Sequence, residues 1–444
     1  MTSRHRRYLP AVLAVGLVVA AGCGGSSSSN GNSGGSSGGS AQSNVSGSID
    51  MLGVWTGPEQ KSFQAVISAF NQKYPNVHVS YKSGGNNITT VLSTAIAGGN
   101  PPDVADIAQP GFVHDLQKKG ALRPITFAKS TVLQNFGQGG VDIGSINGTL
   151  YGVLFKASNK STVWYNVSAF KNAGVQPPKT WPELLSDAKT IHASGLPAYS
   201  IGGSEGWTLT DLFENIYLRT AGPDKYDQLS THAIPWTDPS VKTALKTMAQ
   251  VIGDTSNIAG GTSGALQTDF PTSVNNVLVP GSQQPKAAMV FEGDFVPGTA
   301  TTGAKAGTDY NFFPFPSING SPPVTEVSGD EIVMFKDSPA AEAFIKYLAT
   351  PEAAEVWARR GGFGTLNKKV PLSVYPDPTQ RAVAEQLAKS TTSRFDLSDL
   401  QPSAFGATVG QGEFKIFQDF LKNPSNVTGI AQELESAAAK AYKG

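Results

Sequence analysis

The chain has 444 residues, of which 39% are hydrophobic and only 15% are charged, with 49 Gly and 29 Pro. This length allows two or three compact units with sizeable cores, and the low charge content excludes both a charge-rich disordered chain and a coiled coil. Lys plus Arg and Asp plus Glu both number 34. Because no basic stripe is present either, we do not expect nucleic acid as a partner.

The first 22 residues have the pattern of an export signal. Arg4, Arg6 and Arg7 precede the apolar run Tyr8–Gly22, which has the length of the hydrophobic region of a signal peptide and is too short to span a bilayer as a helix. No other apolar run in the sequence approaches the ~20 residues that a membrane span needs. We therefore expect residues 1–22 to be a signal peptide.

The predicted signal ends at Cys23, the only cysteine of the chain. The run Ala20-Ala21-Gly22-Cys23 resembles a bacterial lipobox, whose cysteine becomes the lipidated first residue of a lipoprotein, although Leu is more usual where Ala20 stands. The alternative is an incidental thiol after an ordinary signal. The segment that follows, up to residue 48, is rich in Gly and Ser and is typical of a flexible tether. The sequence thus predicts a lipidated Cys23, a tether over residues 23–48, and a domain anchored to the outer face of the cell membrane.

From Ile49 onward, short β-rich runs alternate with helical periodicity, which is typical of an α/β fold around mostly parallel sheets. The first such region predicts a βαβαβ unit, whose strand ends should border a crevice. Its strands are expected at residues 49–55, at 77–81 and at the end of 101–107, and its first helix should bury Phe63, Val66, Ile67 and Phe70.

A second region of the same kind begins near Thr162. Thr180 and Glu183 form a capping box that predicts a helix ending at Gly195, and a strand is expected over 199–201. Asp238, Ser338 and Thr350 each precede a proline, so each should open a helix. The last ~75 residues are predicted to be helices joined by loops.

The sequence offers little for catalysis or metal binding. The five histidines are scattered and no zinc or calcium motif occurs, so we expect no metal and no cofactor. Ser204 lies in a G-x-S-x-G run, but only one histidine follows it, and that histidine comes too soon for a hydrolase triad. Paired carboxylates for glycoside hydrolysis stay open as an alternative, because their separation is spatial.

Aromatic residues stand beside acids in several loops that follow predicted strands. Sugars present apolar faces that stack on aromatic rings and hydroxyl rims that bind carboxylates and amides, so this mixture suits a carbohydrate. The alternative for each aromatic residue is an ordinary place in the core. The groups are Trp55 with Glu59, Trp207 with Asp211, and Glu292-Gly293-Asp294-Phe295.

Phrases spread over residues 49–444 resemble the solute-binding proteins of carbohydrate ABC importers, the family that includes maltose-binding protein. Three further phrases are most similar to its α-glucoside-binding branch: Leu218–Pro223, Ile234–Pro239 and Gly361-Gly362-Phe363. The phrases that carry the family resemblance are Val54–Glu59, Gly98–Asp103, Leu150–Val153, Trp164–Asn166, Pro178–Trp181 and Phe312–Pro316.

The resemblance implies a two-lobed periplasmic-binding-protein-like α/β fold, with a hinge and a ligand cleft between the lobes. It implies hinge segments near 156–160 and 311–316. Lobe one should then combine 49–157 with 317–366, and lobe two should combine 161–312 with 367–444.

The resemblance also implies ligand contacts, position by position. Glu59 and Gln109 would bind from lobe one and Asn159 from the hinge, while Trp207 and Phe295 would stack from lobe two. Gln109 stands where an acid is usual, and Phe295 where Trp is usual. The α-glucoside branch adds polar contacts near Gly329, Asp330, Arg360 and Gly361. With Trp55, Asp211 and Asp294 from the aromatic-acid groups, these residues are our predicted site.

We therefore expect a non-enzymatic, monomeric, lipid-anchored receptor that captures a neutral sugar by lobe closure and delivers it to the membrane subunits of an ABC import permease. The sugar is expected to be an α-glucoside or another oligosaccharide. The alternative is an exported glycoside-processing enzyme that uses paired carboxylates.

Overall fold

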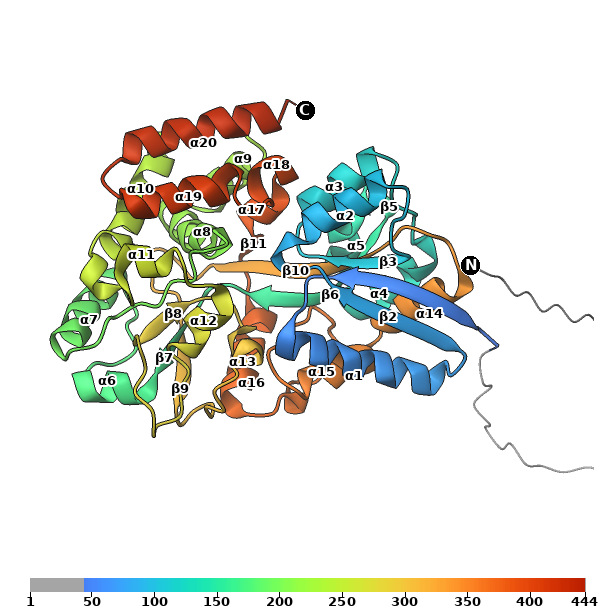
Figure 1. Cartoon of the computed structure of the whole chain (residues 1–444), viewed down its shortest axis with the longest axis horizontal. Coiled ribbons are helices and arrows are strands. Elements are labelled where there is room, and N and C mark those ends of the chain that lie inside the picture. The colour runs from blue at the N-terminus through green and yellow to red at the C-terminus, as the bar shows by residue number, and fades with distance from the viewer. Residues whose placement is uncertain (1–43, 444) are drawn as a thin grey trace, which may run out of the picture. The chain divides into compact units, whose positions relative to one another are not determined.

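The computed structural model describes residues 44–443. The predicted signal peptide and Cys23 lie outside the described residues, as does most of the predicted tether. The described chain forms two α/β lobes side by side, connected by long strands (Figure 1). Among its helices, none combines the length and the apolar character needed to cross a membrane.

A six-stranded mixed sheet forms the centre of lobe one. Strand β1 pairs in parallel with β2 and β3, and the helices between them complete the βαβαβ unit, so this prediction is confirmed. Strand β1 begins at Gly47, two residues before the predicted core and within the segment assigned to the tether. β10 pairs antiparallel with β3 and β6 and parallel with β11. The strands are β1 (Gly47–Gly53), β2 (Val77–Ser83), β3 (Val104–Ile107), β6 (Gly152–Asn159), β10 (Thr325–Met334) and β11 (Ser393–Phe395).

The helices of lobe one cover this sheet on both sides. Their packing follows the predicted periodicity, because Phe63, Val66, Ile67 and Phe70 form one buried stripe of α1. This stripe packs against α14 and α15 around Phe344 and Trp357. The elements are α1 (Gly57–Lys73), α2 (Ile88–Ala97), α3 (Pro110–Lys118), α4 (Lys129–Phe136), α5 (Gln138–Ile143), α14 (Pro339–Leu348) and α15 (Pro351–Ala358), with a small hairpin of β4 (Ser145–Ile146) and β5 (Thr149–Leu150).

Lobe two is built on a three-stranded antiparallel sheet, so the prediction of mostly parallel pairing is wrong for this lobe. The chain enters the lobe along β7 and returns toward lobe one along β9, which makes these neighbours antiparallel. The strand predicted at 199–201 is reduced to isolated bridges at Tyr199. The strands are β7 (Thr162–Asn166), β8 (Met289–Phe291) and β9 (Tyr310–Pro314).

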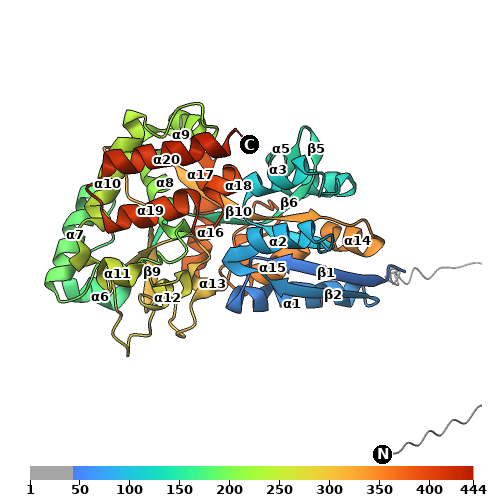
Figure 2. The same ribbon diagram turned by 45° about the horizontal axis from the view of Figure 1, so that its top comes forward.

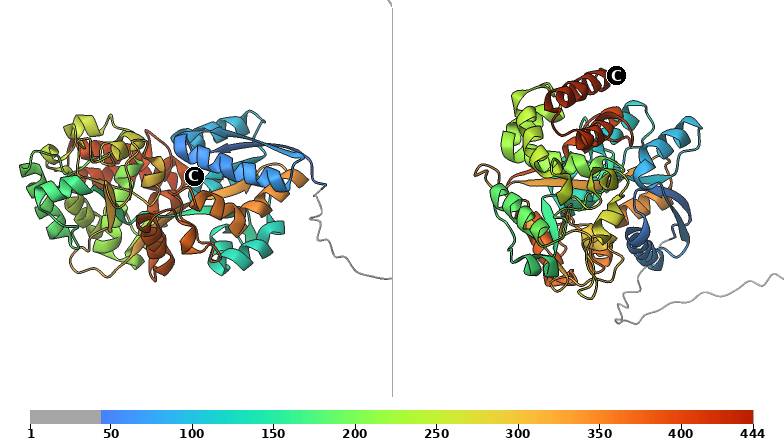
Figure 3. Two further views of the ribbon diagram at one scale, coloured as in Figure 1. Left: turned by 90° about the horizontal axis from the view of Figure 1, so that it is seen from below. Right: turned by 60° about the vertical axis from the view of Figure 1, so that its left-hand side comes forward.

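The helices of lobe two surround a large apolar core that includes the fully buried Trp236 and Phe417. The predicted capping box is present, with Thr180 and Glu183 each accepting from the other's backbone N–H. Figures 2 and 3 show the last two helices, in red, on the outside of this lobe. The helices are α6 (Val167–Ala173), α7 (Trp181–Ala193), α8 (Trp207–Ala221), α9 (Pro223–Ser230), α10 (Pro239–Ile252), α11 (Gly261–Ala265), α12 (Phe270–Asn275), α13 (Val296–Thr299), α19 (Gly412–Lys422) and α20 (Val427–Ala441).

Three stretches of chain connect the lobes. β6 runs on into β7, and β9 is followed by β10, which lies antiparallel beside β6. The third stretch is α16 (Pro378–Lys389), β11, α17 (Leu397–Leu400) and α18 (Ser403–Gly406). α17 and α18 also contact α3, where Ser403 donates to the Asp115 carboxylate from both its N–H and its hydroxyl. The two lobes thus meet along the crossing strands and along this C-terminal segment.

Candidate functional site

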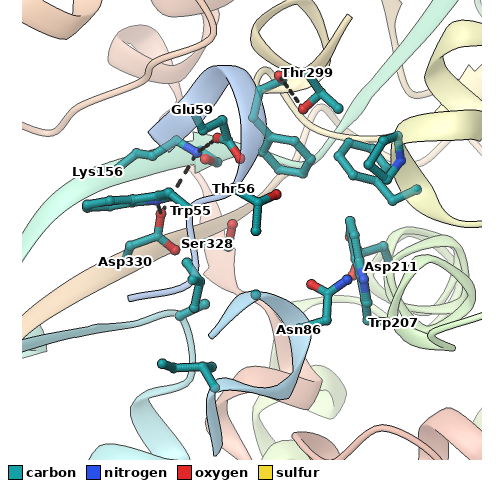
Figure 4. A pocket seen from close by; sticks show the side chains of 18 of the residues that line it. Trp55, Thr56, Glu59, Asn86, Lys156, Trp207, Asp211, Thr299, Ser328 and Asp330 are labelled. Carbon is teal, nitrogen blue, oxygen red and sulfur yellow. Dashed lines mark hydrogen bonds and ion pairs between the residues drawn. The ribbon is translucent and has the colours of Figure 1, made fainter. Parts of the chain in front are cut away.

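A cavity of about 430 Å³ lies between the lobes and is bounded by both of them and by the crossing strands (Figure 4). The end of β1 and the start of α1 form one wall, and the start of α8 with α12 and α13 forms the facing wall. β6 and β10 form its floor, through alternate residues of each strand. The residues that line the cavity include Trp55, Glu59, Asn86, Gln109, Lys156, Lys160, Trp207, Asp211, Phe270, Phe295, Asp330 and Asp399.

The wall of lobe one carries a charged network. Lys156 Nζ lies 2.6 Å from Glu59 Oε1 and 3.8 Å from Asp330 Oδ2, and Trp55 Nε1 donates to the same Asp330 oxygen at 2.7 Å. Burial disfavours the charged ammonium, but Glu59 and Asp330 outweigh burial and raise the pKa of Lys156. The network therefore fixes the direction of the two carboxylates at the cavity.

The facing wall is aromatic. The Trp207 ring lies 5.0 Å from the Phe270 ring and 6.3 Å from the Phe295 ring, centroid to centroid, and the two phenyl rings pack edge to face. Trp207 is the first residue of α8, directly after Gly206, whose φ is 93°. A Cβ atom at Gly206 would lie 2.7 Å from Phe414, so glycine is required there for the helix to begin against α19.

A buried cluster of charges lies behind this aromatic wall. Lys160 Nζ is 2.9 Å from Asp211 Oδ2 and 2.5 Å from Asp396 Oδ2, and all three side chains are less than a tenth exposed. Burial raises the pKa of Asp211 to about 7 despite Lys160. Burial would also raise the pKa of Asp396, but Lys160 and hydrogen bonds from Ser398 and Asp399 hold it below its usual value.

The carboxylates of Asp211, Glu326 and Asp396 also lie within 4.8 Å of one another, a spacing that could hold a metal ion. The ammonium of Lys160 already bridges two of them. We therefore read this cluster as an ion-pair centre at the hinge, and we assign no metal to it.

Two uncharged polar atoms of residues that line the cavity have no hydrogen-bond partner in the described part of the chain. They are the Nε1 donor of Trp207 and the Oε1 acceptor of Gln109. A buried donor or acceptor that stays unpaired costs roughly 1–3 kcal/mol. Both atoms are buried, so the aromatic wall contains an unpaired donor and the opposite wall contains an unpaired acceptor.

Residues 55–355 match the family model described as bacterial extracellular solute-binding protein. This chain belongs to that family. It is therefore a binding protein and not an enzyme, and it acts outside the cytoplasm.

Two relatives are similar over most of their length. The alpha-glucosides-binding periplasmic protein of Rhizobium meliloti is 34% identical over 81% of this chain and 81% of its own. The osmoprotective compounds-binding protein of Synechocystis sp. is 32% identical over 82% of this chain and 86% of its own. The solved structure of the bacterial solute receptor AcbH, described as having an exclusive preference for β-D-galactopyranose, superposes with a TM-score of 0.77 at 19% identity, covering 90% of this chain and 99% of that one. That likeness supports the two-lobed fold.

In this solute-binding protein, most of the predicted site residues line the interlobe cavity. They approach it from both lobes and from β10, so residues more than 200 positions apart in the sequence meet there. They are Trp55, Glu59, Gln109, Trp207, Asp211, Phe295 and Asp330.

Two further predicted residues lie behind the cavity, where they connect segments. The Asn159 side chain is fully buried, with Nδ2 donating to Gln386 Oε1 at 3.0 Å and Oδ1 accepting from the Ser161 N–H at 2.9 Å. Asp294 accepts from the Asn159 N–H through Oδ2 at 3.1 Å. Both side chains fix the crossing strand to lobe two.

The other three predicted residues also lie off the cavity lining. Gly329 packs against the backbone of β6, where a Cβ would lie 2.4 Å from Lys156 O. Arg360 donates from Nε to the Ser62 hydroxyl at 3.1 Å. Gly361 has a φ of 87° and lies against Gln380. These positions shape the lobe around the cavity.

Asp294 should make stability depend on pH. Burial raises its pKa to about 7, although the Asn159 N–H and Lys156 oppose the rise. Between the unfolded value near 4 and the folded value, the native state holds more protons, so the free energy of unfolding should fall as pH rises from 4 to 7. Asp294→Asn should flatten this slope in urea unfolding curves at several pH values. Asp224→Asn, on the surface, is the control. If the slope in Asp294→Asn stays unchanged, the pH dependence of stability comes from another group.

Sequence reasoning missed Lys156 and Lys160, which lie on the same face of the crossing segment and each bind two carboxylates. Their spacing of four along an extended segment was a usable signal, because residues an even number apart share a face. Asn86 and Asp399 were also missed. Nothing in the local sequence distinguishes these two from ordinary loop residues, since only the folded chain brings the loop before α2 and the start of α17 to the cavity.

Proposed function

We propose that this protein captures a neutral sugar, an α-glucoside or another oligosaccharide, in the interlobe cavity and delivers it to an ABC import permease. The observation that carries the proposal is an aromatic wall of Trp207 and Phe295 facing the fixed carboxylates of Glu59 and Asp330 across one cavity. A pyranose ring presents an apolar face and a rim of hydroxyls, and these two walls match the two surfaces.

The ligands named for relatives support this choice. α-Glucosides, osmoprotective compounds and β-D-galactopyranose stand in the names of the similar proteins. We propose that Glu59, Gln109 and Asp330 bind sugar hydroxyls while Trp207 and Phe295 stack on the ring. Trp55, which is only 1% exposed, positions Asp330 through its indole N–H. Asp211 pairs with Lys160 behind the aromatic wall and lines the cavity at the edge of that wall.

The proposal is tested by titrating the purified protein calorimetrically with a panel of neutral di- and trisaccharides, α-linked and β-linked. We expect saturable one-to-one binding of at least one α-linked sugar, recovered chemically unchanged. Affinity should vary little with salt, because a neutral ligand has no long-range Coulomb attraction to screen. A panel without any binding sugar, or binding that collapses with added salt, would contradict the proposal.

Capture should bring the lobes together. A ligand that contacts Glu59 in lobe one and Trp207 in lobe two favours the closed arrangement by its differential affinity. A micromolar dissociation constant corresponds to about −8 kcal/mol, which exceeds a preference of a few kcal/mol for an open state. X-ray scattering of the monomer should therefore show a smaller radius of gyration with saturating sugar. An identical radius in both states would argue against closure.

We also propose that the receptor is anchored through a lipidated Cys23 after removal of residues 1–22. Cys23→Ala should release the protein from the membrane fraction or leave it uncleaved, with sugar affinity unchanged, because a Gly- and Ser-rich tether of about 25 residues keeps anchor and cavity apart. Cys23→Ser is the conservative companion variant and should behave in the same way. Normal membrane fractionation of both variants would exclude the lipid anchor.

A further inference from the structure

A second cavity, of about 640 Å³, lies on the other face of the crossing strands. Ser158, Lys160 and Ser328 line the interlobe cavity, whereas Ser161 and Thr325 line this one. The two cavities are therefore on opposite sides, since neighbouring residues of a strand face opposite ways. The remaining walls of the second cavity come from the end of β9, the loop before β10, the end of α16 and the turn before α7.

The charges on this lining are all positive. Lys179, Arg219 and Lys389 line the cavity, and no Asp or Glu is among its lining residues. The interlobe cavity differs, since Glu59 and Asp330 lie on its wall. Lys389 also pairs with Glu385 at the surface, so Lys179 and Arg219 give the cavity its net positive charge, which favours an anion.

Arg219 shows most clearly that this cavity lacks acidic counter-ions. The residue is only 9% exposed, yet no carboxylate lies within 4.0 Å of its guanidinium nitrogens among residues 44–443. Instead its Nη1 and Nη2 atoms donate to uncharged oxygens, Asn215 O at 3.1 Å and Val324 O at 3.0 Å. Burial lowers its pKa to about 10, and Glu326 opposes this only from beyond ion-pair distance. A buried charge without a direct counter-ion is costly and is normally paired.

The rest of the lining combines apolar surfaces with hydroxyls. The Arg219 guanidinium lies 4.7 Å from the centre of the Phe315 ring, and Phe313 lines the same cavity. Ser317 and Ser321 add hydroxyl groups. Ring and proline surfaces suit an apolar body, while the cations and hydroxyls suit an acidic head.

We propose that this cavity on the reverse of the hinge binds a small organic anion, a carboxylate with a flat apolar body. The acid group lies among Lys179, Arg219 and Lys389, and the apolar body lies against Phe313 and Phe315. This anion site is separate from the sugar cavity, and the proposal does not depend on which sugar binds in that cavity.

Benzoate is the probe, because it has an acid group and a flat apolar ring. Titration of the full purified chain, followed by calorimetry and ligand-observed NMR, should show saturable binding of benzoate. Benzamide, the neutral isostere, should bind at least about tenfold more weakly, since a charge-assisted contact is worth more than 1.4 kcal/mol. Sulfate should bind more weakly than benzoate, because it lacks the apolar body. Added salt should weaken benzoate binding.

The variants remove exposed charges, so that folding is preserved. Lys179 and Lys389 are both exposed, and the one ion pair of Lys389, with Glu385, lies at the surface and contributes little to stability. The double variant Lys179→Gln/Lys389→Gln should lose benzoate affinity about tenfold or more. The matched control Lys129→Gln/Lys246→Gln removes two exposed lysines that do not line the cavity and should bind as the unaltered protein does.

Equal binding of benzoate and benzamide, or equal benzoate affinity in both double variants, would overturn the proposal. Benzoate displaced competitively by a cavity-binding sugar would also overturn it, because the acid would then occupy the interlobe site. A failed sugar panel leaves these outcomes unaffected, so failure of this inference and failure of the proposed function are distinguishable.

Discussion

Trp207→Ala is expected to weaken sugar binding by about 2–4 kcal/mol, the loss typical of a central aromatic contact. The ring lies on the cavity wall, supported by Phe270 and Phe295, and its indole N–H has no partner among the described residues. The variant therefore removes the stacking surface of this wall. Calorimetric titration with the sugar identified by the panel measures the effect.

Two variants separate stacking from folding. Trp207→Phe keeps an aromatic face without the N–H and should recover most of the affinity. Trp236→Phe changes a fully buried tryptophan away from the cavity and should lower stability while leaving affinity unchanged. Normal sugar affinity in Trp207→Ala, or an unfolded Trp207→Ala protein, would show that Trp207 belongs to the core and not to the binding wall.

The predictable parts of this protein are local. Apolar residues spaced three, four and seven positions apart predicted the buried face of α1, and the Thr180 capping box predicted the start of α7. Both predictions were possible because these signals act within a few residues. The pairing of β7 with β8 and β9 was not predictable from such signals. It depends on where the chain re-enters the hinge, more than 120 residues after β7.

The site, too, was predictable only where its residues lie close together in the sequence. Trp55 with Glu59 and Trp207 with Asp211 were recognisable because each pair lies within one loop and helix start. Asn159 was predicted from the family resemblance and Asp294 from an aromatic-acid loop, but Asp294 accepts from the Asn159 N–H and neither residue lines the cavity. Asp399 reaches the cavity through α17, and only the tertiary path of the C-terminal segment determines that.

Lys160→Met is expected to destabilise the fold by about 3–5 kcal/mol at neutral pH, the cost of removing one partner from a buried ion pair. Methionine keeps much of the length of the side chain but leaves Asp396, which is fully buried, without its ammonium partner. Asp211 loses the same partner, but its pKa of about 7 already places it near half protonation at neutral pH. The larger part of the loss should therefore come from Asp396.

The pH dependence identifies the cause. The depressed pKa of Asp396 adds stability above its unfolded value near 4, and that stability is lost as pH falls through the folded value. Without Lys160 the carboxyl should accept a proton more readily, so the gap between Lys160→Met and the unaltered protein should be largest near pH 7 and should narrow toward pH 4. Urea unfolding at both values measures the gap, and Lys246→Met on the exposed face of α10 is the matched control. A gap that is equal at both pH values would mean that the loss comes from packing of the lysine stem and not from the ion pair.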